Sequence, residues 1–286
     1  MNVRTKQIIY IPNGSIDKII TQLKHNNNNI TKLDSYILRL FGSPQHGWID
    51  LNSTDLTKAD FLFAISHAKA AKCNITLIPG ETTVMFLKQL SRQLHLKDDK
   101  LQMFYRRYAY EPEGILVPNT YSVPMGIDAK SLVLLLLHES DIQMKRLSYK
   151  LLGHYNQKQW VRYLIIASII QKEAMPGQQM SLVSSVIHNR LKRHMPLQMD
   201  GALNYGIYSH KIITPQRIKT DHTSYNTYLH VGLPKYPICN VGVNAITAAV
   251  FSAKTSYLYF VTAKNGKFFF SCNFSTHIHN IKNATK

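Results

Sequence analysis

The 286-residue sequence contains few cysteines and no long apolar run. Its three cysteines, Cys73, Cys239 and Cys272, show no metal-ligand spacing and cannot all pair within one chain. We interpret them as buried or incidental thiols. The longest apolar run, Leu132 to Leu137, has six residues, whereas a membrane-spanning helix needs roughly 18.

The N-terminus lacks the apolar region and the cleavage site of a signal peptide. Taken as written, the sequence is expected to give a soluble protein without an export signal, although a chain that had lost an N-terminal anchor would look the same. No GxGxxG, P-loop, GxSxG or HExxH motif occurs, so the common nucleotide-binding, esterase and zinc-protease classes lack support.

Acidic residues are scarce, and they are distributed unevenly. The 34 basic residues outnumber the 16 acidic ones, and the net charge of +18 favours an anionic partner such as nucleic acid, anionic lipid or the acidic peptide stems of bacterial cell wall. Residues 1–150 contain 13 of the acidic residues, which leaves Glu173, Asp200 and Asp221 in the second half. Any carboxylate chemistry there must use these three residues.

The first hundred residues contain a short internal repeat, in which residues 9–23 match residues 76–90. Each copy predicts a β-branched strand, a turn with proline and glycine or asparagine, a hydroxyl N-cap (Ser15 or Thr82) and an amphipathic helix. Two such units indicate a small α+β module. Two unrelated strand–helix segments are the alternative interpretation.

Apolar periodicity predicts further helices, and two aromatic segments predict strands. The expected helices cover residues 58–72, 128–142, 144–153, 160–175 and 181–195. The expected strands include residues 256–261 and 267–271.

Glu173 lies at the end of an apolar helix stripe, three, four and seven residues after Ile170, Ile169 and Ile166. A carboxyl group in such a place loses hydration, which raises its pKa towards neutrality. A general acid that works at neutral pH needs this property. A glutamate that simply points into solvent at a helix end is the alternative.

Other polar residues of the second half are weaker candidates. Asp200 and Asp221 are interpreted as turn or cap residues, and Asp200 is also a candidate for orienting a substrate hydroxyl or amide. His277 and His279 resemble metal ligands only superficially, because no cysteine or carboxylate is near them in the sequence. The many tyrosines could stack on sugar rings, although tyrosines in strands are more often ordinary core or edge residues.

Taken together, these segments resemble the catalytic domain of the YceG-like family, the endolytic murein transglycosylases called MltG. The matching motifs are EGILVPNTY (113–121), LIIASIIQKE (164–173), VSSVIHNRL (183–191), LQMDGALNYG (197–206), YNTY (225–228), GLP (232–234), SYLYFV (256–261) and FSCNFSTH (270–277). The resemblance implies an α+β fold, with a small LysM-like βα module at residues 1–105 and a mixed α+β catalytic domain at residues 106–286. We expect the membrane anchor typical of the family to lie outside this sequence, because no segment of it is apolar enough.

The resemblance also implies a reaction. Glu173 would act as general acid and then as general base in cleaving the MurNAc–GlcNAc bond of peptidoglycan, giving 1,6-anhydroMurNAc ends without a cofactor or a metal. Residues at matching positions are expected to bind substrate or to support the site: Asn189, Arg190, Asp200, Tyr205, Tyr225, Asn226 and Tyr228. We expect Asn189 and the YNTY residues to stabilise the oxocarbenium-like charge.

By resemblance, the partners are peptidoglycan synthases and penicillin-binding proteins, and the catalytic domain faces the periplasm from the inner membrane. Nucleic acid is not an expected partner. Two rivals stay open: a hydrolysing muramidase that uses Asp200 as a second carboxylate, and a non-catalytic protein that binds glycan or nucleic acid.

The sequence departs from the family pattern at three places. Gln171 replaces the first of two glutamates that commonly flank the lysine of the helix motif, so the proton-transfer role is expected to fall on Glu173 alone. Val241 replaces the proline of an Asn-Pro-Gly segment, and the loop loses a fixed φ. Phe268 stands where a histidine is common, which puts the role of that histidine in doubt here.

Overall fold

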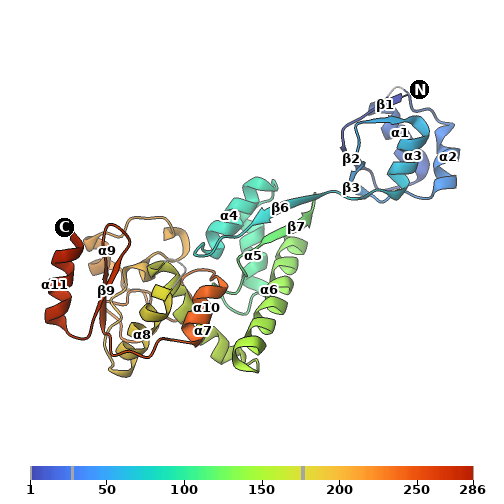
Figure 1. Cartoon of the computed structure of the whole chain (residues 1–286). Helices are drawn as coiled ribbons and strands as arrows, with labels where there is room; N and C mark the ends of the chain where they lie inside the picture. Colours follow the sequence, from blue (N-terminus) through green and yellow to red (C-terminus); the bar gives the residue numbers. More distant parts are fainter. Residues whose placement is uncertain (1, 27–28, 175–177, 286) are drawn as a thin grey trace. The chain divides into compact units, whose positions relative to one another are not determined.

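The computed structural model describes residues 2–26, 29–174 and 178–285, which form two compact units (Figure 1). The first unit consists of Met1–Ile75 and Tyr121–Asp128, and the second of Thr76–Thr120 and Ala129–Lys286. Residues 76–105, expected in the N-terminal module, thus belong to the second unit, because helix α4 (Thr83–Gln93) packs against η2 (Gly206–Tyr208) and α5 (Asp98–Tyr108) packs against α6 (Ala129–Leu152). The interpretation of the two parts as LysM-like and catalytic stays a prediction.

The first unit combines small antiparallel sheets with helices. Strand β1 (Asn2–Arg4) pairs with β4 (Asp55–Thr57). A second sheet has the order β2 (Ile8–Ile11), β3 (Gly47–Asp50) and β5 (Lys69–Ala70). The helices are α1 (Ile16–Asn26), α2 (Asp34–Phe41) and α3 (Lys58–His67).

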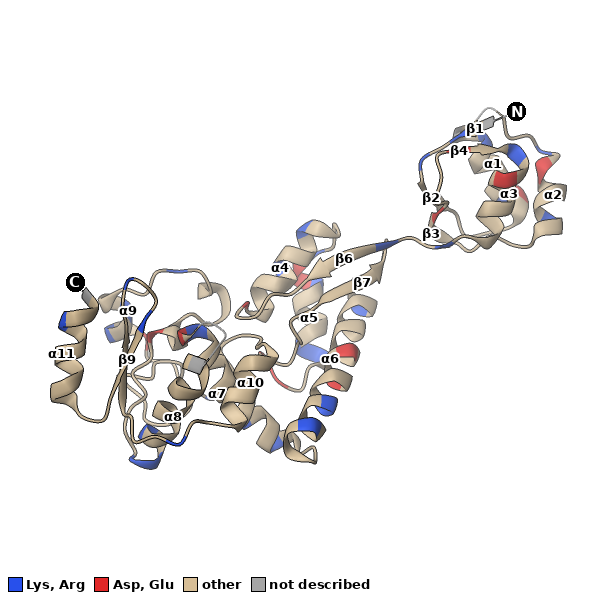
Figure 2. Cartoon of the chain, viewed as in Figure 1, with Lys and Arg blue, Asp and Glu red and all other residues tan. Residues whose placement is uncertain are grey.

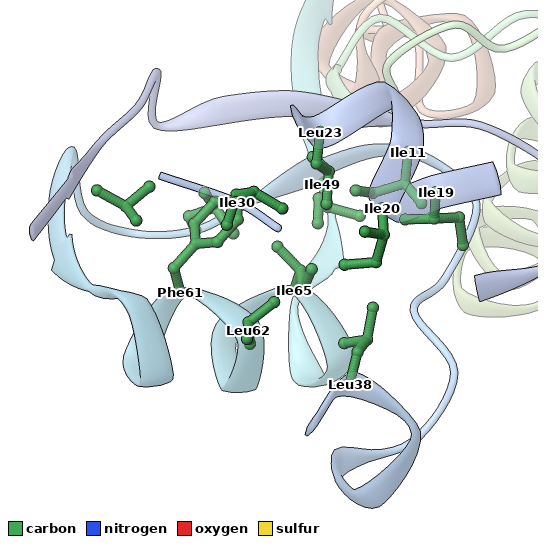
Figure 3. Close-up of a cluster of buried hydrophobic side chains, with 12 residues drawn as sticks. Ile11, Ile19, Ile20, Leu23, Ile30, Leu38, Ile49, Phe61, Leu62 and Ile65 are labelled. Carbon is green, nitrogen blue, oxygen red and sulfur yellow. The ribbon is translucent and has the colours of Figure 1, made fainter. Parts of the chain in front are cut away.

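The core of the first unit is aliphatic except for Phe61, and it lies between the helices and the sheet (Figure 3). Helix α1 contributes Ile19, Ile20 and Leu23, whose spacing of one, three and four residues places them on one face. Ile11 of β2 and Ile49 of β3 reach the same cluster from the sheet. The first copy of the predicted strand–turn–helix repeat is therefore a folded unit of this core.

The second unit is mostly helical. Strand β6 (Lys72–Thr76) pairs with β7 (Thr120–Pro124), and the boundary between the two units falls within both strands. The elements that lie wholly within the second unit are, in order, α4, α5, α6 (Ala129–Leu152), α7 (Gln157–Glu173), α8 (Gln178–Lys192), η1 (Asp200–Leu203), η2 (Gly206–Tyr208), α9 (Pro215–Thr220), α10 (Val243–Val250), β8 (Tyr259–Thr262), β9 (Phe268–Ser271) and α11 (Phe274–Thr285). The mixed content confirms the predicted α+β class.

Helix α7 is the central helix of the second unit. It begins after Asn156, whose side chain accepts a hydrogen bond from the backbone N–H of Gln159 at 3.0 Å. All residues from 164 to 170 are buried, and the helix packs against α8, α10 and η1. Burying each of its isoleucines contributes ~1.5–3 kcal/mol, so the end of this helix, at Glu173, is firmly positioned.

Several predicted helix boundaries are wrong. Helix α8, expected to reach residue 195, ends at Lys192, and residue 175, the expected end of the helix that begins at 160, lies outside the described residues. The helix expected to reach residue 72 ends at His67, because Ala68 is extended and β5 and β6 follow. The two helices expected between residues 128 and 153 are one continuous helix, α6. Although α6 has 24 residues and carries the longest apolar run, the described residues include no helix that is long and apolar enough to cross a membrane.

The N-terminus of α4 is capped in a different way from the one predicted. Thr82 occupies the N-cap position, but its side chain makes no capping bond; its hydroxyl donates to the carbonyl oxygen of Gly206 at 2.8 Å. The buried Glu113 carboxylate instead accepts from the backbone N–H of Thr83 at 3.0 Å and from its hydroxyl at 2.6 Å. The N-terminus of α4 is therefore capped by the carboxylate of Glu113, which is distant in the sequence, and not by the side chain of Thr82.

Candidate active site

Glu173 is the last residue of α7 and is half-buried. The predicted stripe is present, since Ile166, Ile169 and Ile170 are almost completely buried. Burial raises the pKa of the Glu173 carboxyl to about 7, with a further upward contribution from the charge of Asp200, while a hydrogen bond from Gly201 acts in the opposite direction. The group can therefore exchange a proton at neutral pH.

Gly201 determines how closely the η1 turn approaches this carboxyl. Its backbone N–H donates to Oε1 of Glu173 at 2.9 Å. A Cβ atom on Gly201 would lie 2.7 Å from the Cβ of Lys172 and 2.9 Å from Oε1 of Glu173. Only glycine allows this approach. We did not identify Gly201 from the sequence, where the Asp-Gly pair in LQMDG was the available signal.

Asp200 begins η1 and brings a second carboxylate to the site. It is exposed, and it accepts a short hydrogen bond from the hydroxyl of Tyr228. Burial and the bond to Asp200 raise the pKa of the Tyr228 hydroxyl, so this group stays protonated and is a hydrogen-bond donor at neutral pH. The site thus combines the Glu173 carboxyl, which can exchange a proton near neutral pH, with the Asp200 carboxylate and the Tyr228 hydroxyl.

Asn189 and Arg190 connect α8 to the chain before β8. Nδ2 of Asn189 donates to the carbonyl oxygens of Thr255 and Tyr257, both at 2.9 Å. The buried Arg190 donates through Nε to Leu258 O at 2.6 Å and through Nη1 to Leu197 O at 2.8 Å. The Arg190 guanidinium also lies 5.0 Å from the centre of the Tyr259 ring.

Asn226 is completely buried, and its amide is occupied by the backbone. Nδ2 donates to the carbonyl oxygens of Ile218 and Asp221, both at 2.7 Å, while Oδ1 accepts from the backbone N–H of Tyr228 at 3.1 Å. The amide thus fixes the turn that carries Tyr228.

Tyr205 and Tyr225 stack on each other, with ring centres 4.2 Å apart and planes at 13°. The hydroxyl of Tyr205 donates to Oδ2 of Asp221 at 3.0 Å. The Arg217 guanidinium lies 3.9 Å from the centre of the Tyr208 ring, in the same cluster. Asp221 is a cap and turn residue, as predicted: it follows the end of α9, and its Oδ1 accepts from the backbone N–H of Thr223 at 3.0 Å. Its Oδ2 is in addition the hydrogen-bond acceptor of this tyrosine cluster.

A cavity of about 530 Å³ adjoins Glu173. Its lining residues come from α7, α8, η1, β8, α11 and the chain between them: Glu173, Arg190, Leu197, Gln198, Asp200, Tyr228, Tyr259, Phe260, Val261, Phe274, His277 and Ile281. Of the predicted substrate-binding residues, Arg190, Asp200 and Tyr228 belong to this lining.

The other four predicted residues, Asn189, Tyr205, Tyr225 and Asn226, are not part of the lining that the described residues form. Sequence reasoning missed Gly201 and the α11 residues of the cavity wall. Phe268 is also outside this lining, and its ring stacks with Phe260 and Phe270 on the β8–β9 hairpin.

The electrostatics of the region follow from its few acidic residues. Figure 2 shows few acidic residues over α7–α11, which agrees with the three that the sequence has after residue 150. Two of those three, Glu173 and Asp200, line the cavity. In the described ranges, no cluster of three or more histidine, cysteine or acidic side chains could hold a metal ion.

Comparison with known proteins links this chain to one family. The model of the YceG-like family matches residues 9–283. The chain is 30% identical over 176 residues to the endolytic murein transglycosylase of Bacillus subtilis, which covers 61% of this chain and 48% of that relative. It is 31% identical over 179 residues to the endolytic murein transglycosylase of Streptococcus pneumoniae (strain R6). This match covers 60% of this chain and 32% of that relative. The aligned segment thus spans about half and about a third of these curated relatives.

A solved structure has a similar fold. The crystal structure of a yceG-like protein from Listeria monocytogenes superimposes with a TM-score of 0.63 at 25% sequence identity, covering 97% of this chain and 99% of that one. The similarity therefore extends over both compact units of the chain.

Proposed function

Because this chain belongs to the YceG-like family, we propose that it is an endolytic lytic transglycosylase, which cleaves the MurNAc–GlcNAc bond within peptidoglycan strands. The observation that carries the proposal is Glu173, a carboxyl with a pKa of about 7 at the wall of a 530 Å³ cavity. The curated relatives named endolytic murein transglycosylase support the same activity.

In the proposed reaction, Glu173 first acts as a general acid. It gives its proton to the glycosidic oxygen while the bond between this oxygen and C1 of MurNAc breaks. The C6 hydroxyl oxygen of the same MurNAc then forms a bond to C1, and the proton of this hydroxyl goes to the Glu173 carboxylate. The products are a 1,6-anhydroMurNAc end and a new GlcNAc hydroxyl. The proton balance closes without water, and one carboxyl is enough.

Asp200 and Tyr228 are proposed to support the charged transition state. Positive charge develops at C1 when the glycosidic bond breaks, and the Asp200 carboxylate lines the same cavity. The hydrogen bond from Tyr228 holds this carboxylate in one orientation. Asn189 and Asn226, which we expected to contribute dipoles, bind backbone carbonyls instead, so we now propose that they position the loops around the cavity.

A hydrolysing muramidase is the second candidate, since Asp200 provides a second carboxylate beside Glu173. Product analysis distinguishes the two reactions. Purified peptidoglycan is digested with the protein, and the muropeptides are identified by mass spectrometry. A hydrolase adds one water molecule for each bond that it cleaves and produces reducing ends. The lytic reaction adds no water, so its 1,6-anhydro ends are lighter by the mass of one water molecule, about 18 Da.

The charge and the family resemblance suggest where the protein works. With a net charge of +18, the chain attracts the carboxylates of peptidoglycan stems. We propose that it acts on the outer side of the cytoplasmic membrane, near peptidoglycan synthases and penicillin-binding proteins. Co-purification of such synthases with the full-length protein after in-cell cross-linking tests this proposal, and their absence from the cross-linked material would contradict it.

A further inference from the structure

Helix α11 provides one wall of the cavity, and this wall has no role in the reaction described above. The helix begins after Asn273, whose Oδ1 accepts from the backbone N–H of Thr276 at 2.9 Å. Phe274, His277 and Ile281 follow at spacings of three and four residues, so they share one helix face. All three line the cavity that Glu173 also lines.

Phe274 presents an apolar ring at this wall. It is 61% exposed, so the ring is accessible to a ligand. Its ring centre lies 5.8 Å from that of Tyr259, another lining residue. An exposed aromatic ring beside polar groups matches a pyranose ring, whose C–H face stacks on the aromatic face while the hydroxyls find polar partners.

His277 provides a hydrogen-bonding group beside this ring. Its imidazole stacks on Tyr259, with ring centres 5.0 Å apart and planes at 24°. Nδ1 is buried and has no hydrogen-bond partner among the described residues. Nδ1 thus lacks a partner among these residues in either tautomer. With the proton on Nε2, the ring presents Nε2–H as a donor for a ligand.

The charge state of His277 fits this role. Burial and the neighbouring Arg190 lower the pKa of the imidazole, which keeps it neutral at pH 7. The sequence has no acidic residue after Asp221, so this wall does not repel the carboxylates of a peptidoglycan strand.

We propose that Phe274 and His277 form a sugar-binding subsite next to Glu173, which takes an N-acetylhexosamine ring adjacent to the bond that is cleaved. Phe274 stacks on the ring, and Nε2–H of His277 donates to an oxygen of the same sugar. The identity of the ligand as peptidoglycan glycan rests on the proposed function.

Binding to an inactive protein tests the subsite separately from catalysis. Stem-free glycan strands, prepared by amidase treatment of peptidoglycan, are titrated into the full chain carrying Glu173→Gln, and Kd is measured by calorimetry. In this background, Phe274→Ala is expected to weaken binding about tenfold, because it removes both the stacking contact and the apolar area that the ring buries against the sugar.

His277 is tested with two substitutions of opposite character. His277→Phe keeps the stacking on Tyr259 but removes the donor, and it is expected to weaken binding about fivefold to tenfold. His277→Gln keeps an N–H donor and is expected to restore part of this loss. Two controls match these changes: Phe251→Ala, which removes a ring that is 56% exposed and outside this cavity, and His279→Ala, an exposed histidine on the same helix. Both should bind as the Glu173→Gln parent does.

The outcomes separate the subsite from the reaction. Unchanged binding by both Phe274→Ala and His277→Phe, or no binding of glycan strands by the parent, would overturn the subsite, even if the wild-type protein releases anhydro products. Weaker binding by these two variants but not by the controls would support the subsite, even if no anhydro products form and the proposed reaction is wrong. Equal thermal unfolding temperatures of all variants ensure that binding is compared between folded proteins.

Discussion

Replacing Gly201 with alanine should damage catalysis more than it damages the fold. The new Cβ would lie 2.7 Å from the Cβ of Lys172 and 2.9 Å from Oε1 of Glu173, whereas such atoms normally stay at least about 3.4 Å apart. The η1 turn and the end of α7 must therefore move apart by roughly half an ångström to one ångström. The hydrogen bond from the Gly201 N–H to Glu173 would lengthen or break.

The size of the effect follows from this displacement. A shift of about 1 Å at a catalytic group costs about 100-fold in rate, and overpacking of this kind lowers the free energy of unfolding by ~1–3 kcal/mol. We therefore expect Gly201→Ala to reduce kcat/KM about 100-fold. The assay measures the release of anhydro-muropeptides from purified peptidoglycan over time.

A second glycine serves as the control. Gly153, which follows α6, has a φ of +78° and no neighbouring atom within 4 Å of an added Cβ. Gly153→Ala should lower the free energy of unfolding by ~1–2 kcal/mol through backbone strain, without changing kcat/KM. Wild-type turnover by Gly201→Ala would refute the argument that close approach at Gly201 positions Glu173.

Three further predictions concern the acid and its surroundings. Because a general acid must be protonated and the pKa of Glu173 is about 7, kcat should be highest below pH 7 and fall above it; a pH–rate profile that rises through pH 7 would contradict this. Arg190→Lys should lower the free energy of unfolding by ~2–3 kcal/mol, because a lysine cannot donate to Leu258 O and Leu197 O at the same time. Urea unfolding measures this change, and a loss of stability smaller than the error of the titration would disprove the prediction. Asn226→Ala should lower the free energy of unfolding by ~2–4 kcal/mol, because it leaves two part-buried carbonyls without this donor. It should also reduce turnover by releasing Tyr228; unchanged turnover in the folded variant would show that Asn226 does not position this residue.

The position of Glu173 could be predicted because it depends on local periodicity. The apolar residues of α7 recur at spacings of three and four, and such a stripe is buried in any compact fold. The strands β8 and β9 were also predictable from their aromatic and β-branched residues. The family motifs gave the order of these elements along the chain.

The contacts that complete the site could not be predicted, because they join residues that are far apart in the sequence. Gly201 meets Glu173 only after η1 has packed against α7. Glu113 replaces the cap predicted at Thr82 because a buried carboxylate comes within reach of that helix start. His277 was considered only as a weak metal ligand, since its neighbours Glu173 and Tyr259 become visible only in the folded chain.

The central claim is that one carboxyl, Glu173, performs the proton transfers. The most direct measurement compares Glu173→Gln with Asp200→Asn, by mass spectrometry of peptidoglycan digested with each variant and with the wild-type protein. We predict anhydro-muropeptides from the wild-type protein, a loss of at least about 1000-fold for Glu173→Gln, and slower release of the same anhydro products by Asp200→Asn. Anhydro products released at the wild-type rate by Glu173→Gln, together with none from Asp200→Asn, would contradict the claim and assign the chemistry to Asp200.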